Sequence, residues 1–600
     1  MSYSAPVRDM LFVMQELAGL DDVSRLPGFE DATASTVESV LEEAGKLCGE
    51  VWAPLNVAGD RQPAQWREGR VTVTPGFEEA FRQFVEGGWQ GLAHPVEYGG
   101  QGLPRLVGAA CLEMQFAANL SLAMCPSLTD GAIEALLMAG SDAQKQRYLP
   151  RLISGEWSGT MNLTEPQAGS DLGLLRTRAE RQADGTYRIF GTKIFISWGE
   201  HEMSRNIVHL VLARTPDAPA GVKGISLFLV PKYVVGEDGS LGARNDVQCV
   251  SLEHKMGLRG SPTTVLQYGD EGGAIGELIG EENRGLEYMF VMMVAARFHV
   301  GMQGIAVAER AYQKAREYAK ERVQSRPVDG SVPHAVTIVN HPDVRRMLGT
   351  MRALTEASRA LAYVAAGHAD HADHHPDPAE RAVHHALYEF MVPLVKGWST
   401  EMSVEVASLG VQIHGGMGFI EETGAAQFYR DARILPIYEG TTAIQANDLI
   451  GRKTVRDGGA VAQRLIGEIG QVVQTLEASP AFADNAAFRA MHRHLAAGCQ
   501  SFENAVAFVL GHARSDPNAT YAGGVPYLEL VSIVLGGWQM ARALLAAHRR
   551  MHEDPVFYSA KMATAHCYAT YVLPQAAGLE AAIVGARAGE GVLGLDEGAF

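Results

Sequence analysis

The sequence predicts a mainly α-helical protein with one β region inserted near its middle. Residues 156–280 contain runs of β-branched and aromatic side chains separated by Asp-Gly turn pairs. On both sides of this region, apolar residues recur at the three-and-four spacing of amphipathic helices. With 600 residues, of which 47% are hydrophobic, the chain is long enough to fill several cores. The expected segments are an N-terminal helical domain (1–155), a middle β-barrel or β-sandwich (156–280), a C-terminal helical bundle (281–455) and an additional C-terminal helical domain (456–600).

The N-terminal segment carries a helix-start signal near its end. Ser141 precedes Gln144 by three residues, which is the spacing of a capping box. Pro150 follows the turn Lys145–Leu149, and proline is a common helix terminator. We therefore expect a short helix between Ser141 and Pro150.

The middle segment has the texture of an all-β insert. Tyr187–Phe190 and Ile225–Val230 are rich in the residue types that favour strands. The pairs Asp184-Gly185 and Asp238-Gly239 are typical of tight turns. Such a pattern predicts a compact sandwich or barrel.

Helical periodicity returns near Asn283. No proline occurs between Arg297 and Gln324, and small or apolar residues follow one helical face there, until Ser325-Arg326-Pro327 ends the pattern. A second long helix is expected to begin at Pro342, because proline is favoured in the first turn. Further apolar periodicity runs from about 460 to 590.

Composition excludes several classes of protein. The chain carries 69 acidic and 51 basic side chains, a formal charge of -18, which disfavours binding to nucleic acid. Its six cysteines lie far apart without Cys-x-x-Cys spacing, so neither a zinc site nor a disulfide framework is expected, and a cytoplasmic location is favoured. The longest strongly apolar stretch, Leu530–Ala541, is shorter than the ~20 residues that span a membrane, so no transmembrane segment is expected.

A group of histidines has a spacing that can hold a metal ion. His368, His371, His374 and His375 recur at helical spacing. Because the stretch is polar and Pro376 follows at once, we interpret it as a solvated connection between helices and expect no metal there.

Three stretches carry residues suited to chemistry. Met161–Asp171 has small and hydroxyl-bearing residues that allow close approach to a polar ligand, although spacing alone favours a structural turn, in which such residues are common. Gln412–Phe419 is glycine-rich, and its alternative role is to end a helix. Ile437–Thr442 places Glu439 ahead of a helix that Thr441 or Thr442 caps, where a glutamate could simply favour the helix dipole.

Together these stretches resemble the acyl-CoA dehydrogenase family. The matches are TEPxAGSD at Thr164–Asp171, QIxGGxGF at Gln412–Phe419 and YEGT at Tyr438–Thr441, in the family's order and at its separations. The resemblance covers residues 40–453. The additional helical segments resemble those of long bacterial members, which include fatty-acid β-oxidation enzymes and 3-(methylthio)propanoyl-CoA dehydrogenases.

The resemblance implies FAD as the cofactor and an acyl-CoA thioester as the substrate. The residues that it assigns to FAD are Met161, Leu163, Thr164, Gly169, Ser170, Phe195, Ser197, Arg322, Gln324, Gln412, Gly415, Gly416 and Thr441. Those that it assigns to the substrate are Ser170, Arg297, Tyr438 and Gly440. It also implies an electron-transfer flavoprotein as the electron acceptor. The additional C-terminal helices imply a homodimer.

The resemblance makes Glu439 the catalytic base that removes the α-proton as hydride leaves the β-carbon, giving a trans-2-enoyl-CoA. Some members carry the base on the helix that begins near Arg297, but Ala295 and Ala296 precede that arginine here.

Fatty-acid β-oxidation is the first interpretation of the activity, and 3-(methylthio)propanoyl-CoA dehydrogenation is the alternative. An acyl-CoA oxidase is less consistent with Pro166 and Asp171. A DNA-associated homologue is disfavoured because residues 455–600 carry more acidic than basic side chains.

Overall fold

The computed structural model describes residues 3–587 and 589–600. It is mostly helical with a β region in the middle of the chain, which confirms the predicted fold class. The chain forms two compact units. Unit 1 comprises the residues up to Ala5, Glu42–Leu103 and Met114–His299, and unit 2 comprises Pro6–Leu41, Pro104–Glu113 and Val300–Phe600. The division into four domains stays a prediction.

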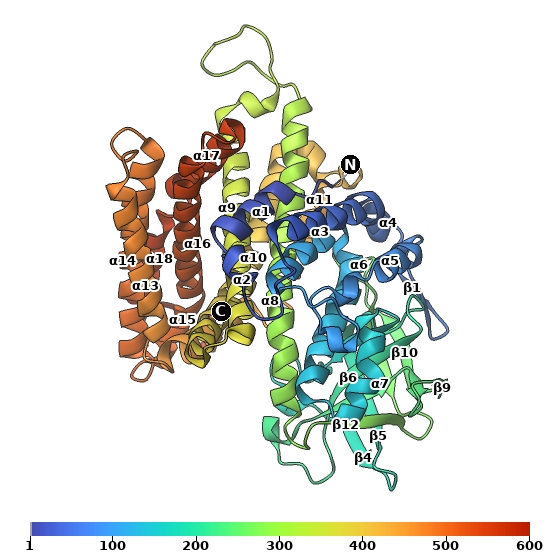
Figure 1. Ribbon diagram of the computed structural model, residues 1–600. Helices are drawn as coiled ribbons and strands as arrows, with labels where there is room; N and C mark the ends of the chain where they lie inside the picture. Colours follow the sequence, from blue (N-terminus) through green and yellow to red (C-terminus); the bar gives the residue numbers. More distant parts are fainter. Residues whose placement is uncertain (1–2, 588) are drawn as a thin grey trace. The chain divides into compact units, whose positions relative to one another are not determined.

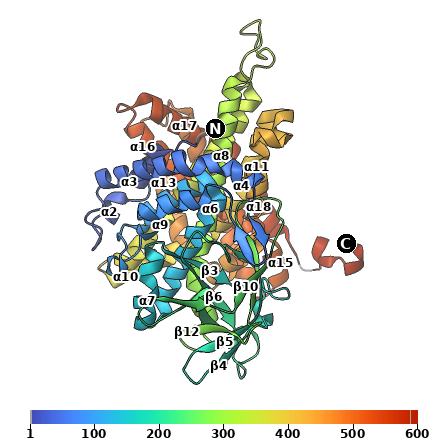
Figure 2. The same ribbon diagram turned by 90° about the vertical axis from the view of Figure 1, so that its right-hand side faces the viewer.

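Unit 1 is built on an eight-stranded sheet with strand order β10-β11-β5-β12-β7-β6-β3, to which β4 is added beside β5 (Figure 2). Its strands are β3 (Trp157–Asn162), β4 (Arg178–Arg181), β5 (Tyr187–Ser197), β6 (Asn206–Ala213), β7 (Ser226–Pro231), β10 (Val247–Leu252), β11 (Thr263–Tyr268) and β12 (Ala274–Ile279). Only β3 and β6 pair in parallel among these strands, and every residue of β6 and β7 is buried. Burial on both faces explains why Leu227–Val230 is continuously apolar.

Helices cover one face of this sheet. The core there joins Ile133 and Leu136 of α6 (Arg105–Ala139), Tyr148 of α7 (Asp142–Ile153) and Leu210 of β6. The capping box at Ser141 is present, as predicted. The helix does not end at Pro150, however, but runs through it to Ile153. Proline removes only one hydrogen bond, and burial of Leu152 and Ile153 favours the continued helix. The remaining elements of unit 1 are α4 (Asn56–Arg61), β1 (Gln65–Arg67), β2 (Arg70–Thr72), α5 (Phe77–Glu86), β8 (Tyr233–Val235) and β9 (Leu241–Arg244).

Unit 2 is helical. The α9–α10 pair contacts α13, α16 and α17, and α14 and α18 pack against α16 (Figure 1). Two helices, α3 (Ala34–Lys46) and α8 (Gly285–Glu321), have residues in both units, as does α6. The others are α1 (Val7–Glu16), α2 (Leu20–Val23), α9 (Pro342–His374), α10 (Pro378–His414), α11 (Ala425–Ala432), α12 (Thr442–Asp448), α13 (Ala460–Ala478), α14 (Ala486–His512), α15 (Pro517–Ala522), α16 (Gly524–Arg549), α17 (Pro555–Tyr571) and α18 (Gln575–Gly585).

Among the residues that the structure describes, three helices, α6, α8 and α16, are long and apolar enough to cross a membrane by length and composition alone. Counting uncharged runs in the sequence missed them, because such a helix tolerates an occasional charge. Their most apolar windows are 94%, 61% and 89% buried inside the protein. Internal packing therefore accounts for most of this apolar surface.

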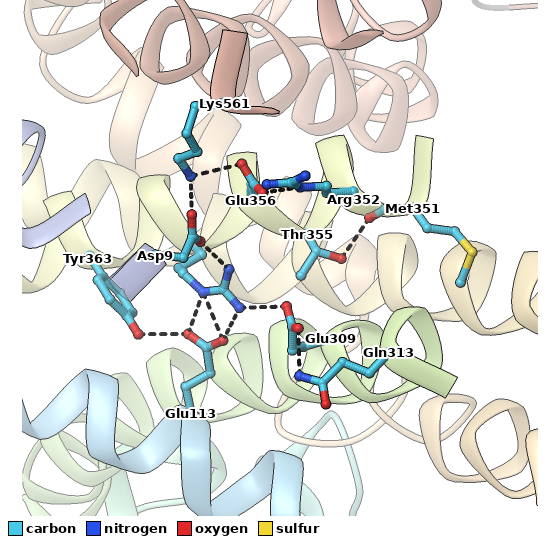
Figure 3. A network of polar contacts seen from close by, with 11 residues as sticks. Asp9, Glu113, Glu309, Gln313, Met351, Arg352, Thr355, Glu356, Tyr363 and Lys561 are labelled. Carbon is cyan, nitrogen blue, oxygen red and sulfur yellow. Dashed lines mark hydrogen bonds and ion pairs between the residues drawn. The ribbon is translucent and has the colours of Figure 1, made fainter. Parts of the chain in front are cut away.

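A buried network of charges crosses unit 2 (Figure 3). Arg359 of α9 pairs with Glu113 of α6 at 2.6 Å and with Glu309 of α8 and Asp9 of α1 at 2.8 Å. Lys561 of α17 also pairs with Asp9, and with Glu356 of α9 at 2.9 Å. Because unpaired buried charges are strongly unfavourable, the network fixes α1 and α17 against α9.

The histidine-rich stretch is not a solvated connection, and that interpretation is wrong. His368, His371 and His374 form the last turns of α9. His371 stacks on His384 of α10, with ring centroids 4.4 Å apart, and His368 Nδ1 lies 2.8 Å from His384 Nδ1. The helix persists because its end packs on α10. Within the described residues, no group of three or more potential ligands is arranged to hold a metal.

Candidate active site

In unit 1 the first motif, Met161–Asp171, lies beside strand β5. The N–H of Ile194 donates to the carbonyl of Thr164 at 2.9 Å, and the Lys193 ammonium donates to the carbonyl of Leu163, also at 2.9 Å. The stretch that starts at Met161 is therefore joined to the strand that carries Phe195. The fold thus brings the stretch Met161–Asp171 next to the part of β5 that carries Phe195, although the two are separate in the sequence.

A buried ion pair holds this junction. Glu165 and Lys193 are 3% and 0% exposed, and their charged atoms lie 2.8 Å apart. Glu165 also accepts hydrogen bonds from the Thr177 hydroxyl at 2.6 Å and from the backbone N–H of Arg176 at 2.7 Å. Burial opposes ionisation of Glu165, but Lys193 and the hydrogen bonds lower its pKa to about 2. Sequence reasoning missed both members of the pair, although Glu165 lies inside the first motif.

Phe195 is an exposed aromatic residue in a strained conformation. Its φ is 60° and its side chain is 59% exposed. On the neighbouring strand, Thr264 pairs with Ile196 but Leu266 pairs with Lys193, so Ile194 and Phe195 form a β-bulge. Bulges re-aim side chains, and a non-glycine residue with this φ costs about 1–2 kcal/mol. The strand thus presents an aromatic face, with half-buried Ser197 two residues further on.

The loop that follows Thr164 is open. Gly169 and Ser170 are exposed, and a Cβ at Gly169 would meet no atom within 4 Å. Crowding within the chain therefore does not require a glycine there, whereas close approach of a ligand to the backbone would. With the aromatic face of Phe195, this bare backbone fits a large, flat cofactor with a phosphate-bearing arm.

In unit 2 the Gln412–Gly416 loop lies at the end of α10. His414 stacks on Tyr318 of α8, with centroids 4.4 Å apart, and its Nδ1–H donates to the carbonyl of Gly410. This contact brings the loop beside the end of α8, one turn from Arg322. Arg322, Gln324, Gln412, Gly415 and Gly416 are all exposed, and a Cβ at Gly416 would meet no atom. These residues form a second polar surface with bare backbone.

Glu439 lies on the loop before α12. It is half-buried, and its φ of 56° is again in the left-handed region. The Thr441 side chain accepts a hydrogen bond from the N–H of Ile444 at 3.3 Å and caps α12, as predicted. The hydroxyl of the neighbouring Tyr438 donates to Gln303 of α8. A carboxylate on a restrained loop has the geometry of a positioned base.

The predicted residues thus fall into two groups, one in each unit. Unit 1 contains Met161, Leu163, Thr164, Gly169, Ser170, Phe195, Ser197 and Arg297, and the last is buried on α8. Unit 2 contains Arg322, Gln324, Gln412, Gly415, Gly416, Tyr438, Glu439, Gly440 and Thr441. A shallow cavity of about 490 Å³ in unit 1, lined by Phe190, Thr192 and Gln267 among others, includes none of them.

Comparisons with known proteins cover nearly the whole chain. Family models match residues 40–156 (acyl-CoA dehydrogenase, N-terminal domain), 160–270 (middle domain), 283–454 (C-terminal domain) and 465–589 (acetyl-CoA dehydrogenase C-terminal like). The chain is 55% identical to 3-methylmercaptopropionyl-CoA dehydrogenase of Ruegeria pomeroyi over 96% of both chains. It is 35% identical to a broad-specificity linear acyl-CoA dehydrogenase of Mycobacterium tuberculosis, over 95% of this chain and 96% of that one.

A solved structure has the same fold. An acyl-CoA dehydrogenase of Bacillus anthracis complexed with FAD aligns with a TM-score of 0.73 and 21% identity, covering 95% of this chain and 91% of that one. The comparisons confirm the expectation of an FAD-dependent acyl-CoA dehydrogenase with an additional C-terminal domain. The chain belongs to the acyl-CoA dehydrogenase family.

Proposed function

We propose that the protein dehydrogenates 3-methylmercaptopropionyl-CoA, which is 3-(methylthio)propanoyl-CoA, to the α,β-unsaturated thioester. The observation that carries this proposal is the 55% identity to the Ruegeria pomeroyi enzyme across 96% of both chains. The alternative interpretation of the sequence is therefore preferred to general fatty-acid β-oxidation. Oxidation of linear acyl-CoA thioesters remains the second candidate, supported by the Mycobacterium tuberculosis relative.

In this proposal Glu439 is the base. Its carboxylate takes the α-proton of the thioester, and the backbone N–H of the same residue faces the thioester oxygen, where negative charge develops. Tyr438, Gly440, Ser170 and Arg297 contact the substrate. Removal of the proton from a weak carbon acid needs both, because the base accepts the proton while the hydrogen bond stabilises the enolate-like charge that forms.

Two exposed surfaces, one in each unit, carry the residues that we assign to FAD. Met161, Leu163, Thr164, Phe195 and Ser197 hold the flavin ring, and Gly169 and Ser170 approach its phosphate arm. In unit 2, the residues that would bind FAD are Arg322, Gln324, Gln412, Gly415, Gly416 and Thr441. FAD held by these residues would supply the acceptor for the β-hydrogen, which leaves as hydride. The chain's own residues orient the thioester, exclude water and hold the proton.

The substrate proposal is tested by comparing kcat/KM for 3-methylmercaptopropionyl-CoA with straight acyl-CoA thioesters from C4 to C18. We expect the thioether substrate to be preferred over butyryl-CoA and over every longer chain. A preference for a longer straight chain would favour the second candidate. Hydrogen peroxide formed in stoichiometric amounts in air would indicate an oxidase instead.

We also propose that an electron-transfer flavoprotein reoxidises the enzyme in the cytoplasm and that the protein is a homodimer. Transient redox encounters bury little surface and need no dedicated motif. Helices α13, α14 and α16–α18 bury apolar surface within unit 2, which removes the drive for two dimers to associate. Light scattering should give the mass of two chains, and a tetramer mass would contradict the dimer.

A further inference from the structure

The loop that carries Glu439 has two successive residues in the left-handed region. Glu439 has a φ of 56° and Gly440 a φ of 85°. Glycine adopts this region freely, but a glutamate does so only where its surroundings hold it. Contacts between the loop and the residues around it must therefore hold Glu439 in this conformation.

Gln445 supplies one such contact. Its side chain is 0% exposed in α12, and its Nε2 donates to the carbonyls of Gly440, at 3.1 Å, and Glu439, at 3.5 Å. Because a carbonyl can only accept a hydrogen bond, the amide nitrogen must face the loop. This orientation leaves Gln445 Oε1 buried without a hydrogen-bond partner. Because an unsatisfied buried amide oxygen costs free energy, the two contacts to the loop are what the Gln445 side chain contributes.

Gln303 supplies the second contact, from α8. Its side chain is 3% exposed, and its Oε1 accepts a hydrogen bond from the Tyr438 hydroxyl. Burial raises the pKa of Tyr438 well above its usual range, so the phenol keeps its proton and is a donor. Contacts from two helices thus restrain the residue before Glu439 and the backbone carbonyls of Glu439 and Gly440.

We propose that Gln445 and Gln303 are positioning residues that hold the Glu439 carboxylate in its reactive place. This inference rests on the proposed role of Glu439 as the base. The two glutamines act through the loop and touch neither substrate nor flavin in this account. Their loss should slow proton removal without weakening substrate binding, because small misplacements of a reacting group reduce rates steeply.

The test replaces Gln445 with Met, which has a similar volume and no hydrogen-bond donor. In anaerobic stopped-flow experiments we expect flavin reduction to slow by about 10- to 100-fold. The Kd for acyl-CoA, measured from the flavin spectrum, should stay within about twofold, since only the chemical step is affected. Gln539→Met is the matched control, because Gln539 is also 0% exposed and its amide oxygen accepts from Arg542 of the same helix. This control should reduce flavin at the wild-type rate.

A double variant separates positioning from general loosening of the fold. If Gln445 acts through Glu439, adding Gln445→Met to Glu439→Gln should slow reduction no further than Glu439→Gln alone. Equal rates for Gln445→Met and wild type, or an additive loss in the double variant, would overturn the inference. If Gln445→Met does not retain FAD, Gln303→Met answers the same question with the same two comparisons. A Glu439→Gln enzyme that reduces flavin normally would instead overturn the proposed base, which is a separate outcome.

Discussion

The Arg359 guanidinium pairs with the Glu113 carboxylate at 2.6 Å, and the two side chains are 1% and 0% exposed. The same guanidinium also forms ion pairs with Glu309 and Asp9, so one cation contacts three carboxylates from three helices (Figure 3). Burial raises the pKa of Glu113, and Arg359 opposes that shift. This arrangement makes the stability of unit 2 depend on a single side chain.

Arg359→Met should therefore destabilise the protein strongly. Removing one partner leaves buried carboxylates uncompensated, and such losses are about 3–5 kcal/mol. Chemical denaturation followed by circular dichroism measures the change. Arg346→Met is the control, because Arg346 pairs with Asp343 on the exposed surface of α9, where a pair contributes about 0–1 kcal/mol. Similar losses for the two variants would contradict the role of the network.

Stability should fall as the pH drops from about 6.5 to 4.5. Burial lowers the pKa of His201, His209 and His368 to about 3 and that of His384 to about 4. The unfolded chain binds these protons near pH 6.5, so acidification favours unfolding by up to about 1.4 kcal/mol per group and pH unit. Burial also lowers the pKa of His371, His414 and His494, which adds to this effect. Asp370, whose pKa burial raises to about 7, acts in the opposite direction, as do Glu113, Glu405 and Glu529, so four carboxyl groups oppose seven histidines.

Thermal midpoints measured across this range test that expectation. Carboxylates with lowered pKa values, such as Glu165 and Asp9 at about 2, lose most of their contribution below pH 4.5, and the small part lost earlier also destabilises the protein on acidification. A His384→Gln variant keeps a polar side chain but has no proton to gain, so its midpoint should depend less on pH. A midpoint that rises on acidification would show that these histidines are not held neutral.

Phe195→Ala should weaken FAD binding without affecting the fold. The side chain is 59% exposed, so little core packing is lost, whereas aromatic stacking contributes about 0.5–1.5 kcal/mol, or roughly 2- to 10-fold in Kd. Phe195→Trp should restore the affinity. Leu174→Ala is the matched control, since Leu174 is 56% exposed in the same unit. Titration of the apoprotein with FAD gives the values, and an unchanged Kd for Phe195→Ala would remove Phe195 from the flavin site.

Local signals in the sequence predicted much of the fold. The order of helical and β segments, the capping box at Ser141, the start of α9 at Pro342 and the cap at Thr441 all follow from residues within one or two turns. The structure differs from these local predictions where tertiary packing outweighs the preference of the local sequence. α7 continues through Pro150, and the histidine-rich end of α9 stays helical against α10.

Local sequence signals predicted less of the candidate site than of the fold. The roles of Glu439 and Phe195 were predicted only from the family resemblance. No residue in either stretch indicates that these two would adopt a left-handed φ. Their supports are long-range: Gln303 meets a tyrosine 135 residues away, and Asp9 meets Lys561 across 552 residues. Pairings of this kind depend on how helices pack, which residue spacing does not encode.

The central claim is that Glu439 removes the α-proton, and anaerobic flavin reduction by Glu439→Gln tests it most directly. The change keeps the size of the side chain but removes its basic oxygen and its charge. Thermal stability, bound FAD and the spectral response to acyl-CoA should be preserved, because the residue lies half-buried on a loop. Reduction by 3-methylmercaptopropionyl-CoA should slow by at least about 10²- to 10⁴-fold. Flavin reduction by this variant at close to the wild-type rate would contradict the account.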